Sequence, residues 1–299
     1  MFKNCIIFRL DPAWSMDLLD MEVALGRQVF NHCGATQEKS AGWVPPRGAD
    51  HGALVEVVAG QRIMCFQVET KSVPSQVIKR HLDERIAKID QNEGRKPGRK
   101  EQRELRDEIT PELLPHAFPK ITQILTWIDL EHGRLVLDCS SQGNAGKAVT
   151  ALVQCLPGLM VSQLLCHVAP QAAMTQWLAG DQGEWPTPFA AGRHVELHSG
   201  DEMKSIVKFD RHHLDDDQMR LHISQGKLPT KLELDWQGRA TFMLTDGMQL
   251  RRIKLLDVVF EGEKAEDEGG FDADVAIATG ELSALITDLV HAMGGEFAP

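Results

Sequence analysis

The sequence predicts an α+β fold in which antiparallel β-hairpins are interrupted by helices. Short apolar segments are separated by tight turns, as at Ala59-Gly60-Gln61 and Gln237-Gly238, which is typical of hairpins. Helical periodicity is confined to a few segments, of which the C-terminal one is the most regular. Strands and helices do not alternate regularly, so a parallel βαβ sheet is not expected.

Composition predicts a globular protein. The chain has 299 residues, of which 42% are hydrophobic and 25% are charged, so it has room for a sizeable core in one large or two smaller domains. No apolar run approaches the ~18 residues of a membrane span, and the N-terminal segment is too interrupted for a signal peptide. We therefore expect a cytoplasmic protein without a membrane partner. The six cysteines form no C-x-x-C pair and are expected to be reduced core thiols, so no metal or cofactor is predicted.

The N-terminal quarter is predicted to contain three strands and one helix. Residues 2–10 form the first strand, and Ser15 is a suitable N-cap for a helix that extends to about Gln28. The apolar positions of this helix are Leu18, Leu19, Val23 and Leu25. Residues 42–46 are expected to be a rigid loop, because two prolines fix φ and remove two hydrogen-bond donors. The next two strands form a hairpin over residues 53–58 and 63–68.

A helical pair is predicted between the two hairpins of the N-terminal half. A first helix starts at Pro74-Ser75 and has apolar residues at helical spacing, namely Ile78, Leu82, Ile86 and Ile89. A second helix over residues 99–109 is almost without apolar residues and is expected to end at Thr110-Pro111. Because such a pair buries little of its own surface, we expect it to project from the body of the protein as an arm.

The remaining elements are shorter, apart from the last helix. Further strands are predicted at residues 121–130, 134–139, 161–165, 193–198, 205–209, 230–236, 239–244 and 249–255. Further helices are predicted at residues 144–156, 170–178 and 215–225. The last helix has an apolar face formed by Leu282, Leu285, Ile286, Leu289, Val290 and Met293.

The loop at residues 181–192 is the predicted domain boundary. It separates a central α+β region, residues 1–73 and 118–180, from a second α+β lobe, residues 181–299, that carries the C-terminal helix. Residues 74–117 are the protruding charged arm of the central region.

Positive charge is concentrated in residues 79–106. Ten cations and six anions give this segment a net charge of +4, whereas the whole chain carries −11. Residues 257–299 hold eleven acids and one base, so the chain is electrostatically polarised. A local surplus of cations attracts a polyanion whatever the net charge. The segment has no aromatic residue for base stacking and no recognition-helix scaffold, which favours contact with the DNA backbone without sequence readout.

The predicted DNA-contacting cations lie in this segment and in two later strands. They are Lys79, Arg80, Arg95, Lys96, Arg99, Lys100, Arg103, Arg106, Lys208, Arg211, Arg251, Arg252 and Lys254. Charge alone leaves a second interpretation open, in which residues 79–106 are a solvated helical hairpin that binds no partner.

Two further function classes stay open at this level. His212 followed by Asp215, Asp216 and Asp217 has the residue types of a divalent-metal site, which would suit a metal-dependent nuclease, although acids at the start of a helix also compensate its dipole. A protein-interaction module that docks through the C-terminal helix is the other class. His194 and His198 are predicted to share one face of a strand without converging, so no zinc site is expected there.

Six short strings occur in an order that resembles the bacterial recombination-associated protein family RdgC. They are Gly42-Trp43-Val44-Pro45-Pro46, Pro74-Ser75-Gln76-Val77-Ile78-Lys79, Leu113-Leu114-Pro115-His116-Ala117-Phe118, Trp127-Ile128-Asp129, Thr230-Lys231-Leu232-Glu233-Leu234-Asp235-Trp236-Gln237, and Phe271-Asp272-Ala273-Asp274 with Thr279-Gly280-Glu281-Leu282. Each string is unspecific alone, but together they span nearly the whole chain.

The resemblance implies a non-enzymatic DNA-binding protein. Family members form a ring-shaped homodimer of two horseshoe-shaped protomers, and its positively charged hole encircles double-stranded DNA without sequence preference. The family is associated with restraint of the recombinase RecA, and with replication and recombination on the nucleoid. Phe118 would be the gate residue at which the ring closes, and Arg211 and His212 would form the second gate contact. The family more usually has Lys-Gln at that second position.

Overall fold

The computed structural model describes residues 2–49, 51–180, 185–200, 204–214, 217–260 and 270–297. Within these residues, twelve strands form one open sheet with the order β2-β4-β5-β6-β1-β12-β11-β10-β8-β9, while β3 also pairs with β4 and β7 with β1. The strand pairs are antiparallel. The predicted α+β class with antiparallel hairpins is therefore confirmed.

Strands and helices have the following bounds. The strands are β1 Cys5–Leu10, β2 Lys39–Val44, β3 Val55–Val58, β4 Gln61–Lys71, β5 Pro119–Asp129, β6 Arg134–Asp138, β7 Val161–Gln163, β8 Phe189–Ser199, β9 Ile206–Asp210, β10 Lys227–Trp236, β11 Ala240–Thr245 and β12 Gln249–Leu255. The helices are α1 Leu18–Leu25, α2 Ser75–Glu93, α3 Arg99–Leu113, α4 Gln142–Cys155, α5 Pro170–Ala179, α6 Asp217–Ser224 and α7 Phe271–Ala292, with short 3-10 turns η1 Gly26–Gln28, η2 Leu114–His116 and η4 Asp257–Val259.

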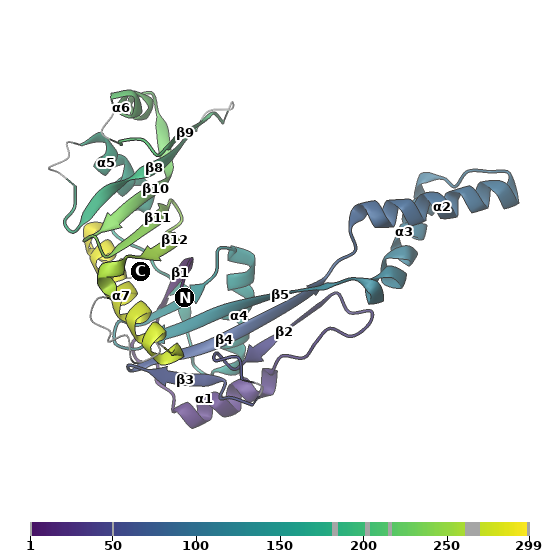
Figure 1. Ribbon diagram of the computed structural model, residues 1–299, viewed down its shortest axis with the longest axis horizontal. Helices are drawn as coiled ribbons and strands as arrows, with labels where there is room; N and C mark the ends of the chain where they lie inside the picture. Colours follow the sequence, from purple (N-terminus) through teal and green to yellow (C-terminus); the bar gives the residue numbers. More distant parts are fainter. Residues whose placement is uncertain are drawn as a thin grey trace.

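The chain has a bent outline with two arms that diverge from a common corner (Figure 1). One arm is the long β4–β5 ribbon that ends in α2 and α3, and the other contains β8 to β12 with α5 and α6. The sheet continues through the corner because β1 pairs with both halves. It pairs with β6 over five residues, but with β12 only through Cys5 opposite Leu250 and Ile6 opposite Gln249.

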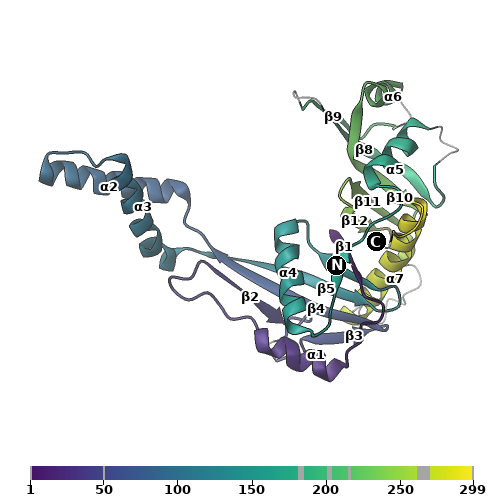
Figure 2. The ribbon, with the colours of Figure 1, turned by 180° about the vertical axis from the view of Figure 1, so that it is seen from behind.

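The two halves of the sheet are covered differently. In the N-terminal half, α1 and α4 bury one face together with Ile6, whereas α7 covers the opposite face, which includes Ile7 and Trp127. In the C-terminal half, α5 and α7 cover the face that includes Leu232 and Phe242. Figures 1 and 2 show α5 and α7 outside strands β8 to β12, so the uncovered face of these strands turns toward the open side of the bend.

Helix α7 joins the two halves of the sheet. The buried Arg134 of β6 donates through Nη1 to Thr287 Oγ1 at 2.9 Å, and Trp236 of β10 donates through Nε1 to Asp288 Oδ2 at 2.8 Å. By length and composition α7 is the only described helix that is apolar enough to cross a membrane, but half of that stretch is buried. Its apolar face therefore belongs to the core, as its helical periodicity predicts.

The predicted charged arm is a helical hairpin at the end of the β4–β5 ribbon (Figure 1). Leu82 and Ile109 are the only residues buried within α2 and α3. The hairpin is closed at Gly94, whose φ of 65° is accessible to glycine without strain. Arg85 of α2 forms ion pairs with Glu108 and Glu112 of α3, which compensate for the small apolar contact between the helices.

The expected apolar face of the first helix is confirmed only for Leu25. Leu18, Leu19 and Val23 are exposed, and Met21 and Ala24 are buried in their place. The physical reason is Glu22, whose carboxylate accepts hydrogen bonds from the backbone N–H groups of Leu54 and Val55 at 2.9 and 3.0 Å. These bonds fix the rotation of α1 about its axis. The helix is also shorter than predicted and has its N-cap at Asp17.

Three predicted boundaries also differ from the structure. The expected rigid loop begins as strand β2, because Gly42 and Trp43 pair with Gln67 and Phe66 of β4 and only the prolines lack donors. Helix α3 continues through Pro111 to Leu113, although Pro111 has no N–H to donate to the carbonyl four residues before it. Strand β8 starts within the expected boundary loop, of which residues 181–184 lie outside the described residues.

Candidate nucleic-acid interface

The uncovered face of the C-terminal half is polar, as the alternation of strand β10 shows. On β10, Leu232 and Leu234 point into the core, and Lys231, Glu233 and Asp235 therefore point to the other side. The neighbouring strands contribute more polar residues to this face, namely Glu196 and His198 of β8, Lys208 and Asp210 of β9, and Gln249 and Arg251 of β12. We call this surface the inner face.

Lys208, a predicted DNA contact, is held on the inner face by an acid. Glu196 accepts from Lys208 Nζ at 3.1 Å, from Lys231 Nζ at 3.1 Å and from His198 Nε2 at 2.8 Å. Burial raises the pKa of Glu196, but these three hydrogen bonds outweigh it and bring the pKa to about 2. The carboxylate stays charged and fixes both ammonium groups between neighbouring strands.

The three basic residues of β12, Arg251, Arg252 and Lys254, have different surroundings. Arg251 donates to Gln249 Oε1 at 2.7 Å and to the carbonyl of Ser140 at 3.0 Å, so its guanidinium joins the inner face to the segment before α4. Arg252 and Lys254 are exposed. A register shift on β12 breaks the strict alternation here, and Arg252 has a φ of 53°. Arg252 therefore turns into the same surface hollow as Arg211.

The cations of the arm fall into two groups. Some are already paired with acids. Arg95 bonds Glu93 and Glu101 at 2.7 and 2.8 Å, while Arg80 and Lys100 lie 3.9 Å from Glu84 and Glu104. The others are exposed and make no ion pair within the described part of the chain; they are Lys79, Lys88, Lys96, Arg99, Arg103 and Arg106.

Three of the unpaired arginines share one side of α3. Arg99, Arg103 and Arg106 recur at i, i+4 and i+7, a spacing that aligns side chains along a helix. They project from a helix that is far from the core, so their charge is available to a partner.

The two predicted gate contacts lie on different arms of the chain. Phe118 sits between η2 and the start of β5, and 93% of its surface is exposed, the largest fraction among the exposed apolar residues. Arg211 and His212 follow β9 at the end of the other arm (Figure 1). The ring of His212 lies 6.0 Å from that of Phe209 on the same arm, and its backbone N–H donates to the carbonyl of Arg193.

The residues of the nuclease hypothesis are only partly described. Asp215 and Asp216 lie outside the described residues, and Asp217 is an exposed residue 4.0 Å from Arg220. Imidazole Nδ1 of His212 is 2.9 Å from the carbonyl of His213. Within the described ranges no three His, Cys, Asp or Glu side chains lie close enough together to bind a metal ion. These observations do not favour the nuclease hypothesis.

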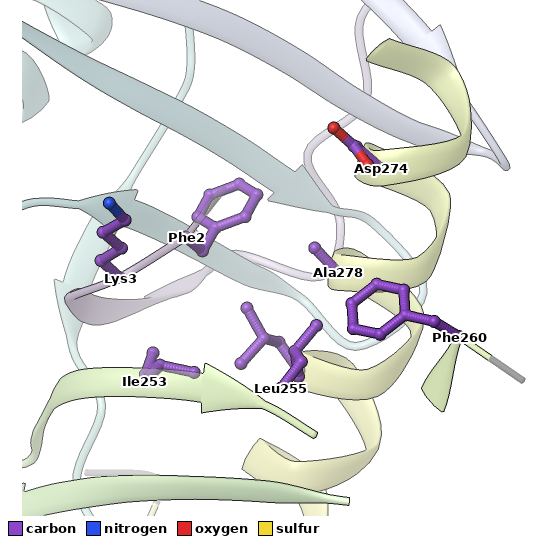
Figure 3. A pocket seen from close by; sticks show the side chains of 8 residues that line it. Phe2, Lys3, Ile253, Leu255, Phe260, Asp274 and Ala278 are labelled. Atoms are coloured by element: carbon purple, nitrogen blue, oxygen red, sulfur yellow. The ribbon is translucent and has the colours of Figure 1, made fainter. Parts of the chain in front are cut away.

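A separate hollow of about 210 Å3 lies at the corner of the molecule (Figure 3). Phe2, Leu255, Phe260 and Ala278 line it, and Lys3 and Asp274 are its charged residues. The apolar side chains come from the N-terminal segment, β12, η4 and α7. Such a lining offers no cluster of cations, so we do not place nucleic acid here.

Two cations of the inner face, Arg193 and Lys231, are not among the predicted DNA contacts. Lys231 could have been found from the alternation of the predicted strand at residues 230–236. Arg193 could not, because a bulge in β8 decides its direction.

Comparison with known proteins gives a consistent assignment. The family model described as "Putative exonuclease, RdgC" matches residues 1–296. Relatives named "Recombination-associated protein RdgC" include one from Cupriavidus necator, 37% identical over 298 residues (99% of this chain and 98% of the relative), and one from Dechloromonas aromatica, 38% identical over 301 residues with the same coverage. A third, from Proteus mirabilis, is 34% identical over 299 residues, which is 99% of this chain and 98% of the relative. The relatives are named for an association with recombination, the family description names a putative exonuclease, and this chain belongs to the RdgC family.

Proposed function

We propose that this protein binds duplex DNA without sequence preference and acts in recombination as a closed homodimer. The observation that carries the proposal is the arrangement of charge. Unpaired arginines of α3 lie on one arm, and the cations of the inner face lie on the other, on either side of the open bend (Figure 1). A second copy that joins the two arms would convert the bend into a ring around DNA.

The gate contacts support two copies rather than one. Phe118 and the pair Arg211–His212 belong to different arms, so within one chain they do not close the bend. An aromatic side chain that is 93% exposed at the base of α3 is suited to an apolar contact with a partner. We propose that Phe118 of one protomer and the segment at Arg211 and His212 take part in closing the ring.

The resemblance to the RdgC family extends the proposal to its role in the cell. A ring on duplex DNA, which could also hold single strands, would deny DNA to RecA and so restrain recombination, and it would support replication. A cytoplasmic, nucleoid-associated location is part of this proposal, which requires no cofactor.

The test compares two matched pairs of variants. Arg99→Gln with Arg103→Gln removes two charges from the arm, while Arg27→Gln with Lys39→Gln removes two from η1 and β2, away from the open side of the bend. Because log K falls by ~0.9 per neutralised phosphate with log salt, the arm pair should lower the salt slope by about 1.8 per protomer and the control pair should not. Wild-type binding that is independent of salt would refute the proposal.

Two further measurements address sequence preference and nuclease activity. Two unrelated duplexes should lose affinity equally in the arm variant, since backbone contacts carry no sequence information. DNA incubated with Mg²⁺ or Mn²⁺ should remain intact. Cleavage that Asp215→Ala abolishes would instead support the metal-dependent nuclease.

A further inference from the structure

The inner face contains a hollow of about 480 Å3 that three arginines line. Arg193 comes from β8, Arg211 from the turn after β9, and Arg252 from β12, so the three lie far apart in the sequence. All three are exposed, and within the described residues their guanidinium groups have no hydrogen bond or ion pair. We call this surface the arginine hollow.

Each arginine reaches the hollow through an irregularity of the backbone. Strand β8 bulges between Ala191 and Val195, where three residues oppose the single Glu233 of β10. Arg211 and Arg252 have φ angles of 56° and 53°, in the left-handed region that few non-glycine residues adopt. Bulges and left-handed residues redirect side chains that a regular strand would place elsewhere. Three such irregularities at one hollow indicate that the convergence is built into the fold.

Gly192 is required for the first of these irregularities. A Cβ at this position would lie 2.5 Å from Glu233 Cγ and 2.9 Å from the Glu233 carbonyl oxygen. The close approach lets Glu233 Oε2 accept a hydrogen bond from the backbone N–H of Arg193 at 2.8 Å. Glu233 therefore holds the backbone of Arg193 and leaves its guanidinium unpaired.

The three acids of the hollow, Asp210, Glu233 and Asp235, form their hydrogen bonds with groups other than the arginine side chains. Asp210 Oδ1 is 3.1 Å from His194 Nδ1, and this hydrogen bond, followed by the charges of His194, Arg211 and Arg252, lowers the pKa of Asp210. Asp235 accepts from the backbone N–H of Gly238 at 2.8 Å. Neither carboxylate forms an ion pair with the three arginines. The three guanidinium groups repel one another, and an anion placed between them would relieve that repulsion.

We propose that the arginine hollow binds a single phosphate group of a DNA strand. The inference rests on the proposed DNA-binding function and adds a discrete contact to it. Guanidinium groups bind phosphate oxygens through paired N–H donors, and three of them around one hollow match the several oxygens of one phosphate. The shared chemistry fits both an internal diester and a terminal phosphate of the strand.

The decisive measurement is the salt slope of DNA binding in the double variant Arg193→Gln with Arg252→Gln. Two arginines on one phosphate should lower the slope by about 0.9 per protomer, half the change of the arm pair Arg99→Gln with Arg103→Gln. Affinity at ~0.1 M salt should fall about tenfold or more. A slope equal to that of the control pair Arg27→Gln with Lys39→Gln, or a fall of about 1.8, would overturn the single-phosphate site.

Three DNA substrates separate the two sources of phosphate. They are a covalently closed circle, a linear duplex with 5′-phosphates and the same duplex with 5′-hydroxyls. Equal loss on all three assigns an internal diester, and loss confined to the 5′-phosphorylated duplex assigns a terminal phosphate. If the double variant keeps its affinity for all three substrates, the inference is overturned while the proposed function stands.

A titration without DNA keeps the inference testable if the proposed function fails. Calorimetry with inorganic phosphate should show saturable binding to the wild type and its loss in the Arg193→Gln, Arg252→Gln variant. Equal binding by wild type and variant would place the anion elsewhere. The thermal midpoints of the variants, measured in parallel, should match that of the wild type, because both side chains are exposed.

Discussion

The substitution Glu196→Gln is expected to make the stability of the protein less dependent on pH. Glu196 is buried on β8 and accepts hydrogen bonds from His198, Lys208 and Lys231, which keep its pKa at about 2. A carboxyl group whose pKa is lowered by folding stabilises the folded state above its unfolded pKa. That contribution is lost as the pH falls toward the folded pKa.

The magnitude follows from the two pKa values. The ordinary value of 4.5 and the folded value of about 2 differ by about 2.5 units, which corresponds to about 3 kcal/mol near neutral pH at 1.36 kcal/mol per unit. Most of this stabilising contribution is lost as the pH falls between these two values. Linkage predicts that about 2 kcal/mol of this contribution disappears between pH 6 and pH 3.

Urea denaturation from pH 6 to pH 3 measures the effect. The free energy of unfolding of the wild type, minus that of the Glu196→Gln variant, should fall by about 2 kcal/mol over this range. Glu131→Gln is the matched control, because Glu131 is exposed in a turn and forms no ion pair with any described residue. A difference that stays constant with pH would refute the assignment of Glu196 as a charged, hydrogen-bonded carboxylate.

Three further substitutions test the fold and the proposed ring. Gly42→Ala should lower the free energy of unfolding by about 1–3 kcal/mol, because its Cβ would lie 2.5 Å from the backbone of Phe30; an unchanged urea midpoint would contradict this. Ser283→Ala removes the hydroxyl that donates to buried Asp129 at 2.9 Å and should cost about 1–3 kcal/mol in the same assay, a loss that an isosteric Ser283→Cys would not restore. Phe118→Ser should leave the protomer folded, because the side chain is exposed, but weaken the dimer in sedimentation velocity; an unchanged dimer would count against Phe118 as a gate.

Much of the local structure was predictable from residue patterns. The hairpin of β3 and β4 and that of β5 and β6 were predicted from apolar segments around short turns, and both are confirmed. Helix α7 was predicted from its apolar periodicity, which its buried residues confirm. Failures occurred where a distant contact decides the outcome. Hydrogen bonds from the backbone of Leu54 and Val55 to Glu22 fix the rotation of α1 about its axis. Residues 42–44, expected to begin a loop, pair with β4 and belong to strand β2.

The candidate interface was likewise predictable only in part. The sequence predicted the concentration of cations in residues 79–106, and α2 and α3 do form a helical hairpin. It did not predict which of these cations are neutralised, because ion pairs such as Arg95 with Glu101 depend on side-chain geometry. Arg193 was missed because its direction depends on a bulge against β10.

The sequence by itself determined the class of the fold, the family and the charge polarity of the chain, because these depend on residue types and on patterns a few residues long. Only the tertiary structure decided which surfaces those charges form. The pairing of Cys5 with Leu250 joins the two halves of the sheet, and the irregularities at Arg193 and Arg252 bring arginines from separate strands to one hollow. Such arrangements depend on contacts between residues that are distant in the sequence, which a local pattern does not encode.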